Sequence, residues 1–170
     1  MGRDNRSPVA YCSSTTFTNG NFDEKSAVVL VVDDDPGDQE LMQWVLEKSK
    51  FRYDVHTVAN GEEALDYLLR RGQYEDPALS PRPDLILLDL YMPRLDGKQV
   101  LEHMRVHPEL CGIPVVVISA SQYQGDIEHA YRLGCNLFIA KPVDAVQFVN
   151  VIRSLEEYWF ETVALPPKEG

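Results

Sequence analysis

Polar side chains that can do chemistry stand at four places where an apolar stretch of the sequence stops. The apolar stretches are residues 28–32, 85–88, 115–118 and 137–140. The polar residues that follow them are Asp33, Asp34, Asp35, Asp89, Ser119 and Lys141. Short apolar runs that alternate with helical patterns are typical of buried parallel strands, and ligands bind beyond the carboxyl ends of such strands. We therefore expect carboxylates, a hydroxyl and an ammonium to meet in one crevice.

Such a crevice suits the acceptance of a phosphoryl group. Asp33, Asp34 and Asp89 would raise one another's pKa values by repulsion, which a divalent cation and the Lys141 ammonium would relieve. Mg²⁺ binds a few carboxylate or carbonyl oxygens and keeps waters that a phosphate can replace. A carboxylate beside the metal and a lysine is a competent acceptor, and the Ser119 hydroxyl can hydrogen-bond a phosphoryl oxygen. Each residue alone is most often a cap, turn or loop residue, but their conjunction favours a phosphoacceptor site.

The elements that must position these side chains alternate five times between strand and helix. Strands are expected at about 27–32 and 53–58 and in the runs that end near Asp89, Ser119 and Ala140. Helices are expected from Pro36, after Gly61, at 97–107, at 126–133 and from Asp144. Asp35 and Asp144 are expected to cap the first and last helices, and residues 71–83 to form a surface loop. The pattern predicts an α/β fold, a five-stranded parallel sheet with helices on both faces.

Composition limits the partners of this chain. Its 170 residues fit one domain, and 27 acidic residues against 16 Lys and Arg give a net charge of −11. This balance disfavours nucleic-acid binding, which depends on basic groups. No apolar stretch approaches the length of a membrane span, and residues 1–26 are expected to form a flexible polar arm. Three widely spaced cysteines, Cys12, Cys111 and Cys135, are expected to be reduced thiols of a cytoplasmic protein.

Four short motifs surround the polar residues. They are Val31-Val32-Asp33-Asp34-Asp35, Leu87-Leu88-Asp89-Leu90-Tyr91-Met92-Pro93 with Asp96-Gly97, Ser119-Ala120-Ser121, and Lys141-Pro142. Together they resemble the receiver domains of two-component response regulators, and the resemblance covers residues 27–156. It implies a doubly wound, flavodoxin-like fold and a phosphoryl group accepted from a sensor histidine kinase. It implies a signalling protein that assists its own phosphorylation and dephosphorylation rather than an enzyme.

The resemblance also implies a role for each matching residue. Asp89 would be the phosphorylation site, and Asp33 and Asp34 the acidic pair. Mg²⁺ would be bound by this pair, by Asp89 and by the backbone carbonyl of Tyr91, with Asp34 the more direct ligand of the pair. Lys141 would contact the phosphoryl group.

Two further positions would respond to phosphorylation. Ser119 takes the place of the switch hydroxyl, and Phe138 takes that of the aromatic rotamer switch. Tyr91 is larger than the polar residue often found at its position, and its ring is a candidate shield of the acyl phosphate. Asp35, next to the acidic pair, is expected to cap a helix instead of joining the site.

A closer resemblance is to the stand-alone regulators that partner cyanobacterial phytochromes. It is carried by the Pro-containing loop before Asp84, by the turn at 119–121 and by the tail at 155–166. The resemblance implies a phytochrome-type histidine kinase as partner.

Two other function classes compete with a receiver. A phosphohydrolase of the haloacid dehalogenase type also combines a strand-end aspartate, a Ser or Thr, a lysine and Mg²⁺. It normally carries the nucleophile on the first strand and an acid/base aspartate two residues later, whereas here the acceptor follows the third strand and residue 91 is Tyr. An interaction module independent of phosphorylation would lack site residues, and none is missing here.

The last helix extends beyond what a receiver needs. A receiver sheet is covered by about Leu155, but the chain continues with Tyr158-Trp159-Phe160 and 163–165, which are apolar. Three consecutive aromatics cannot all face one core, so at least one is expected to pack elsewhere. We assign a receiver at 27–156 and an aromatic tail at 157–170. Exposed apolar surface and Trp or Tyr anchors favour a homodimer through the last helix and tail. The alternative is a tail that folds back on its own domain as a clasp.

Overall fold

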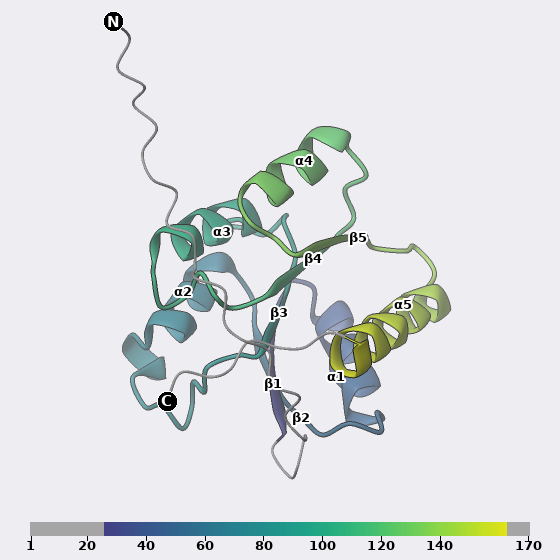
Figure 1. The fold of residues 1–170 in the computed structure, drawn as a ribbon, viewed down its shortest axis with the longest axis horizontal. Coiled ribbons are helices and arrows are strands. Elements are labelled where there is room, and N and C mark those ends of the chain that lie inside the picture. The colour runs from purple at the N-terminus through teal and green to yellow at the C-terminus, as the bar shows by residue number, and fades with distance from the viewer. Residues whose placement is uncertain (1–25, 163–170) are drawn as a thin grey trace, which may run out of the picture.

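Five short strands pair in parallel within one sheet, which confirms the predicted fold class (Figure 1). The strands are β1 (Ala27–Val32), β2 (Tyr53–Val58), β3 (Leu85–Leu88), β4 (Val115–Ser119) and β5 (Leu137–Ala140), in the order β2-β1-β3-β4-β5. The computed structural model describes residues 26–162. The expected flexible arm, apart from Ser26, and residues 163–170 of the tail lie outside the described residues.

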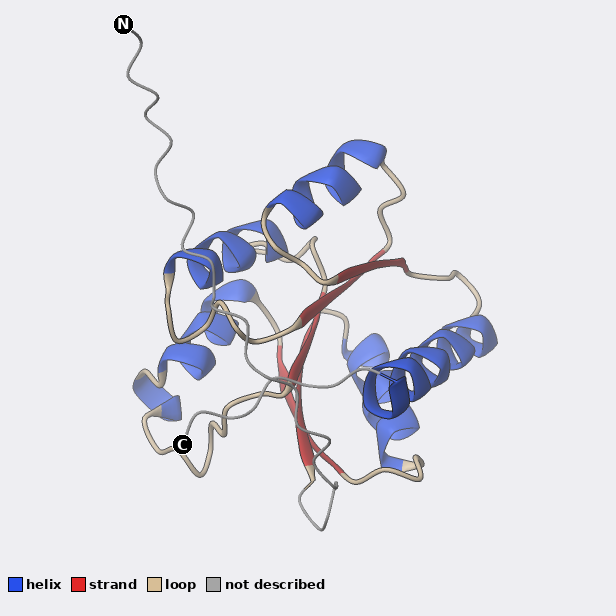
Figure 2. Cartoon of the chain, viewed as in Figure 1, coloured by secondary structure: helices blue, strands red, loops and turns tan. Residues whose placement is uncertain are grey.

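Helices cover both faces of the sheet, as the pattern predicts (Figures 1 and 2). On one face lie α1 (Pro36–Glu47) and α5 (Ala145–Glu157); on the other lie α2 (Gly61–Leu69), α3 (Gly97–Val106) and α4 (Gln124–Arg132). The chain continues past α5 in a π-helical turn, Tyr158–Thr162. The direction of winding reverses between β1 and β3, which is where doubly wound sheets bind ligands.

The apolar runs of the sequence are strands buried on both faces. Every residue of β1, β3 and β4 is buried. Alternate residues enter two separate cores, so that Leu30 and Leu88 pack under α2 to α4, whereas Val29 and Leu87 pack under α1 and α5. The central strands are thereby packed from both faces, which fixes the positions of the residues at their carboxyl ends. Within residues 26–162, no helix combines the length and apolar character that crossing a bilayer requires.

The predicted caps are confirmed. The Asp35 carboxylate accepts hydrogen bonds from the backbone N–H groups of Gly37 at 2.8 Å and Asp38 at 3.3 Å. Asp144 caps α5 by accepting from the N–H group of Val146 at 2.8 Å. Because side chains fix both helix starts, the loops that precede them have defined paths beside the ends of β1 and β5.

Two segments differ from expectation. The helix α4 begins at Gln124, two residues before the predicted start. The loop at 71–83 contains a short 3₁₀ helix, Gly72–Tyr74, and is anchored by side chains. The Tyr74 ring packs edge-on against Tyr67 at 5.3 Å between centroids, and its hydroxyl donates to Glu63 at 2.7 Å. Tertiary contacts therefore order a segment that lacks periodicity.

The aromatic extension after α5 packs mainly on its own chain. Trp159 and Phe160 are only 6% and 7% exposed and belong to the core under α1 and α5. The Phe160 ring lies 5.0 Å from that of Tyr53 and 6.2 Å from that of Phe51, measured between centroids. The expectation of exposed surface is therefore wrong for these two residues, and Phe160 packs against the start of β2 and the loop before it. Tyr158, at 53% exposed, faces outward.

This packing predicts unequal costs for truncating neighbouring aromatics. Phe160→Ala should lower the free energy of unfolding by about 3–5 kcal/mol, the usual cost of emptying a buried aromatic site. Tyr158→Ala, the matched control, should change it by about 0.5 kcal/mol or less. Urea denaturation followed by circular dichroism measures both. Equal losses in the two variants would contradict the clasp.

Candidate functional site

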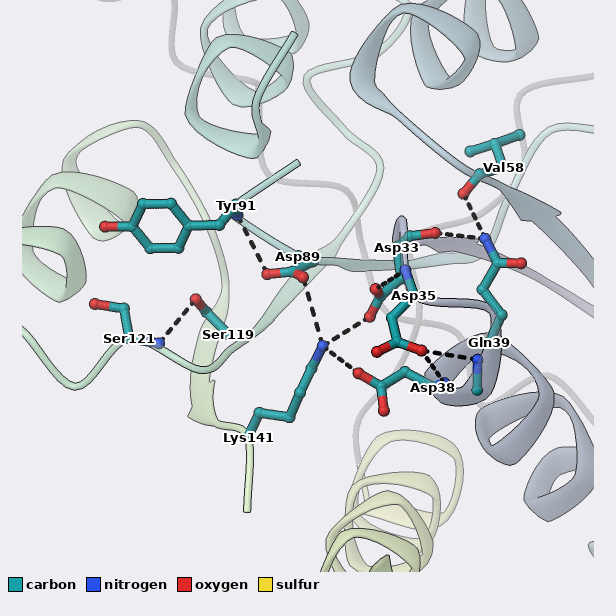
Figure 3. A network of polar contacts seen from close by, with 11 residues as sticks. Asp33, Asp35, Asp38, Gln39, Val58, Asp89, Tyr91, Ser119, Ser121 and Lys141 are labelled. Atoms are coloured by element: carbon teal, nitrogen blue, oxygen red, sulfur yellow. Dashed lines mark hydrogen bonds and ion pairs between the residues drawn. The ribbon is translucent and has the colours of Figure 1, made fainter. Parts of the chain in front are cut away.

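The strand ends bring the predicted residues together. Asp33 and Asp34 follow β1, Asp89 follows β3, Ser119 ends β4 and Lys141 follows β5. Carboxylate oxygens of Asp33, Asp34 and Asp89 all lie within 4.8 Å of one another. Figure 3 shows Asp33 and Asp89 facing the Lys141 ammonium from different strands. The parallel arrangement makes this possible, because the carboxyl ends of neighbouring strands meet at one edge.

Lys141 is shared among three carboxylates. Its Nζ lies 2.8 Å from Asp33, 2.7 Å from Asp38 and 3.4 Å from Asp89. Asp38, in the first turn of α1, was missed in the sequence analysis. Its place in the first turn of the helix expected from Pro36, directly after the three strand-end aspartates, is the signal that could have found it.

Burial sets the charge balance of this cluster. Loss of solvation raises the pKa of Asp33, while the Lys141 hydrogen bond opposes that rise. Loss of solvation also raises the pKa of Asp89; Lys141 opposes this and Asp33 adds to it. Burial disfavours the Lys141 ammonium, but hydrogen bonds with Asp33 and Asp38 outweigh it and raise the pKa of the lysine. Three carboxylates, those of Asp33, Asp38 and Asp89, thus share the single positive charge of Lys141.

Backbone groups orient the site side chains. Asp33 accepts from the N–H group of Asp35 at 2.9 Å, and Asp89 accepts from that of Tyr91 at 3.2 Å. The amide of Gln39 donates to the carbonyls of Asp33 at 2.5 Å and Val58 at 3.1 Å. Gln39 thus ties the ends of β1 and β2 together, as Figure 3 shows.

Close backbone approach holds the loop after Asp89. A Cβ atom at Gly97 would lie 2.2 Å from the Asp89 carbonyl oxygen, and the Gly97 N–H group donates to Leu90 at 2.9 Å. On the other side, a Cβ atom at Gly61 would lie 2.3 Å from the carbonyl oxygen of Leu95. The first residues of α2 and α3 must therefore be glycines for this loop to keep its path.

The two predicted switch residues lie on neighbouring strands. Ser119 is fully buried, and its hydroxyl oxygen accepts from the N–H group of Ser121 at 3.2 Å. Phe138 is partly buried against the core under α4, and its N–H group donates to the Tyr131 hydroxyl at 3.1 Å. The register pairs Phe138 with Val117, so the two switch positions are offset by two residues along the paired strands β4 and β5.

A second polar cluster was missed in the sequence analysis. It is centred on Asp126 of α4, which accepts hydrogen bonds from Tyr91, Lys98 and Ser121. These residues come from three separate segments, and no regular spacing connects them. The pairing of β3 with β4 and the packing of α3 beside α4 bring them together.

The acidic cluster fits a divalent cation. Three carboxylates within 4.8 Å form an oxygen donor set of the kind that Mg²⁺ and Mn²⁺ bind. Burial has raised the pKa of two of them, so a cation would relieve both the repulsion and the lost solvation. Chemically, the arrangement offers an oxygen nucleophile at Asp89, a cation site and an ammonium that can contact an incoming anion.

Comparisons with known proteins agree with this arrangement. Residues 29–153 match the response regulator receiver domain. The response regulator Rcp1 of Synechocystis sp. is 37% identical over 139 residues, which span 82% of this chain and 92% of that protein. The phosphorylated cyanobacterial phytochrome response regulator RcpA is 39% identical with a TM-score of 0.79, over 84% of this chain and all of that one. The Mn²⁺-bound form of Rcp1 is 36% identical with a TM-score of 0.78, over 83% and 99%. By fold, site and sequence, this chain belongs to the response regulator receiver domain family.

Proposed function

We propose that the protein receives a phosphoryl group on Asp89 from a phosphohistidine of a sensor histidine kinase and signals through the resulting change of surface. The observation that carries the proposal is the position of Asp89, which shares its crevice with Asp33, Asp34 and the Lys141 ammonium. Other aspartates of the chain, such as Asp35 and Asp144, are occupied as helix caps.

The residues divide the transfer reaction among them. An Asp89 oxygen attacks phosphorus, the bond from phosphorus to the histidine nitrogen breaks, and the imidazole leaves with the electron pair. Lys141 moves from its carboxylate partners toward the new phosphoryl oxygens, and the Ser119 hydroxyl donates to one of them. The N–H group of Tyr91 holds the Asp89 carboxylate, and the N–H group of Asp35 holds that of Asp33.

Mg²⁺ is the proposed metal, held by Asp33, Asp34, Asp89 and the backbone carbonyl of Tyr91. Of the acidic pair, Asp34 is proposed as the more direct ligand, because Asp33 already contacts Lys141. Bound there, the metal would neutralise charge on the phosphoryl oxygens. The Mn²⁺-bound form of the related Rcp1 supports a divalent cation in this family.

A phytochrome-type histidine kinase is the proposed partner, in the cytoplasm. RcpA is a cyanobacterial phytochrome response regulator, and a receiver from R. palustris that is 34% identical, with a TM-score of 0.76, acts in red light signalling. A receiver domain at 27–156 remains our proposed organisation. The tail boundary at 157 is less sharp than expected, because Trp159 and Phe160 pack in the domain core.

A phosphoacceptor fits the site better than a hydrolytic enzyme does. In the haloacid dehalogenase scheme, the residue two positions after the nucleophile donates a proton to the leaving group. That residue is Tyr91, and its hydroxyl is engaged by Asp126 at 2.5 Å. Figure 3 shows the Tyr91 hydroxyl pointing away from Asp89, so it is not placed for that role.

Substitution of the acceptor tests the proposal. Wild-type protein incubated with acetyl phosphate and Mg²⁺ should be labelled, whereas Asp89→Asn should not, because the amide cannot accept the group. EDTA should abolish labelling of the wild type. Asp66→Asn, at an exposed position of α2, is the matched control and should label normally. Labelling of Asp89→Asn equal to wild type on a phosphate-affinity gel would reject the acceptor.

Ser119 and Phe138 are proposed to couple the phosphoryl group to the surface around α4, β5 and α5. When the Ser119 hydroxyl turns to the phosphoryl oxygen it leaves the Ser121 N–H group, and Phe138 turns into the vacated space.

Loss of the contacting groups should uncouple phosphorylation from this response. Ser119→Ala and Lys141→Ala should lose the phosphorylation-dependent change in hydrogen exchange at α4 and β5, even where Asp89 is labelled. Ser119→Thr, which keeps the hydroxyl, should retain it. A normal exchange response in both alanine variants would argue against the coupling.

A homodimer is proposed through α5 and the turn that follows it. An open groove of ≈ 390 Å³ lies between the edge strand β5 and α5. It is lined by Leu137, Ile139, Asn150, Val151, Ser154, Leu155 and Tyr158. Tyr158 is exposed beside this apolar surface, and a two-fold contact would bury it against the same groove of a second copy.

Light scattering tests the dimer without disturbing the core. Deleting the tail would remove the buried Trp159 and Phe160, so a point change is the better test. Tyr158→Asp should turn a dimer at tens of micromolar into a monomer, whereas Tyr123→Asp, at an exposed site away from the groove, should not. Wild-type protein that is monomeric with and without acetyl phosphate would refute the dimer.

A further inference from the structure

A buried carboxylate links the loop after Asp89 to the loop after Ser119. Asp126, in the first turn of α4, is 5% exposed. The Tyr91 and Ser121 hydroxyls both donate to its Oδ2 atom at 2.5 Å, and the Lys98 ammonium lies 2.6 Å from its Oδ1 atom. Hydrogen bonds from Lys98, Ser121 and Tyr91 lower the pKa of Asp126, so the carboxylate stays ionised and keeps all three donors.

Two partners of Asp126, Tyr91 and Ser121, occupy equivalent places in the loops after β3 and β4. Tyr91 stands two residues after Asp89, and its N–H group donates to that carboxylate at 3.2 Å. Ser121 stands two residues after Ser119, and its N–H group donates to that hydroxyl at 3.2 Å. The residues that hold the acceptor and the hydroxyl by their backbones are therefore joined to each other by their side chains.

The Tyr91 ring is fixed at both ends. Its backbone is tied to Asp89, its hydroxyl is tied to α4, and the Lys98 ammonium lies 5.7 Å from the ring centroid. Figure 3 shows the ring beside Ser119 and Ser121. Tyr91 is 54% exposed whereas Asp89 and Ser119 are buried, so the ring lies at the solvent-exposed edge of the site.

We propose that Asp126 is a positioning residue that holds the Tyr91 ring at the edge of the phosphoryl site and so slows hydrolysis of the acyl phosphate. The inference rests on the proposed function. In hydrolysis, a water oxygen attacks phosphorus, the bond from phosphorus to the Asp89 oxygen breaks, and the products are the free carboxylate and inorganic phosphate. A ring held by Asp126 restricts the approach of that water, and a ring released from Asp126 does not.

Decay of the phosphorylated protein tests this role. Tyr91→Phe removes only the hydroxyl, and Asp126→Asn removes the charge at nearly constant size. Protein is loaded with acetyl phosphate and Mg²⁺, the donor is removed, and phosphate on Asp89 is followed on phosphate-affinity gels. Each variant should lose phosphate about tenfold faster than wild type, a change that corresponds to about 1.4 kcal/mol. The double variant should be no faster than either single one, because both changes break the same contact.

The control is Tyr123→Phe, a tyrosine of the same loop that is 72% exposed, which should decay at the wild-type rate. Thermal unfolding of each variant separates a loss of positioning from a loss of fold, and Tyr91→Phe decides the matter if Asp126→Asn does not fold. Decay of Tyr91→Phe at or below the wild-type rate, or additive acceleration in the double variant, would overturn the inference and leave the proposed function standing. A wild-type protein that takes up no phosphoryl group would instead overturn the proposed function, and this inference with it.

Discussion

The crowding of negative charge around one ammonium is the constraint on which the rest of the structure depends. Asp33, Asp38 and Asp89 all contact Lys141, and Asp34 lies beside them. Two unit charges 4 Å apart interact by about 4 kcal/mol at an effective dielectric constant of 20, so such a group would not stay together on a flexible scaffold. The central strands, buried on both faces, and the helix caps hold it in place. The two cores thus offset a repulsion that makes the site receptive to a cation.

The residues at the strand ends were predictable because parallel geometry leaves little choice. Once Asp33, Asp89, Ser119 and Lys141 each follow an apolar run, the sheet itself brings them to one edge. Caps such as Asp35 were predictable for a different reason, since a cap acts within three residues of its own position. These features depend on local sequence and on one global fact, the parallel sheet.

Other features depend on how helices rotate and pack, and no periodicity in the sequence contains that information. Lys98 and Asp126 are 28 residues apart and meet only because α3 lies beside α4. Phe160 is buried because Phe51 and Tyr53 lie beside the end of α5 and contact its ring. The apolar character of the tail could be recognised from sequence, but its partner could not, because a chain's own domain and a second copy are equally apolar from that viewpoint.

The glycines that flank the loop after Asp89 leave it tightly packed on one side only. At Gly61 and Gly97 the backbones of α2 and α3 press against the loop with no space for even a methyl group. On that side, backbone contacts leave the loop after β3 no space to move. On the opposite side, the loop into α4 is held by side-chain hydrogen bonds of Ser119, Ser121 and Asp126, which can be exchanged one at a time. We therefore expect a displacement that starts at Asp89 to be transmitted toward α4 and β5, where contacts can be exchanged, and to be resisted at α2 and α3.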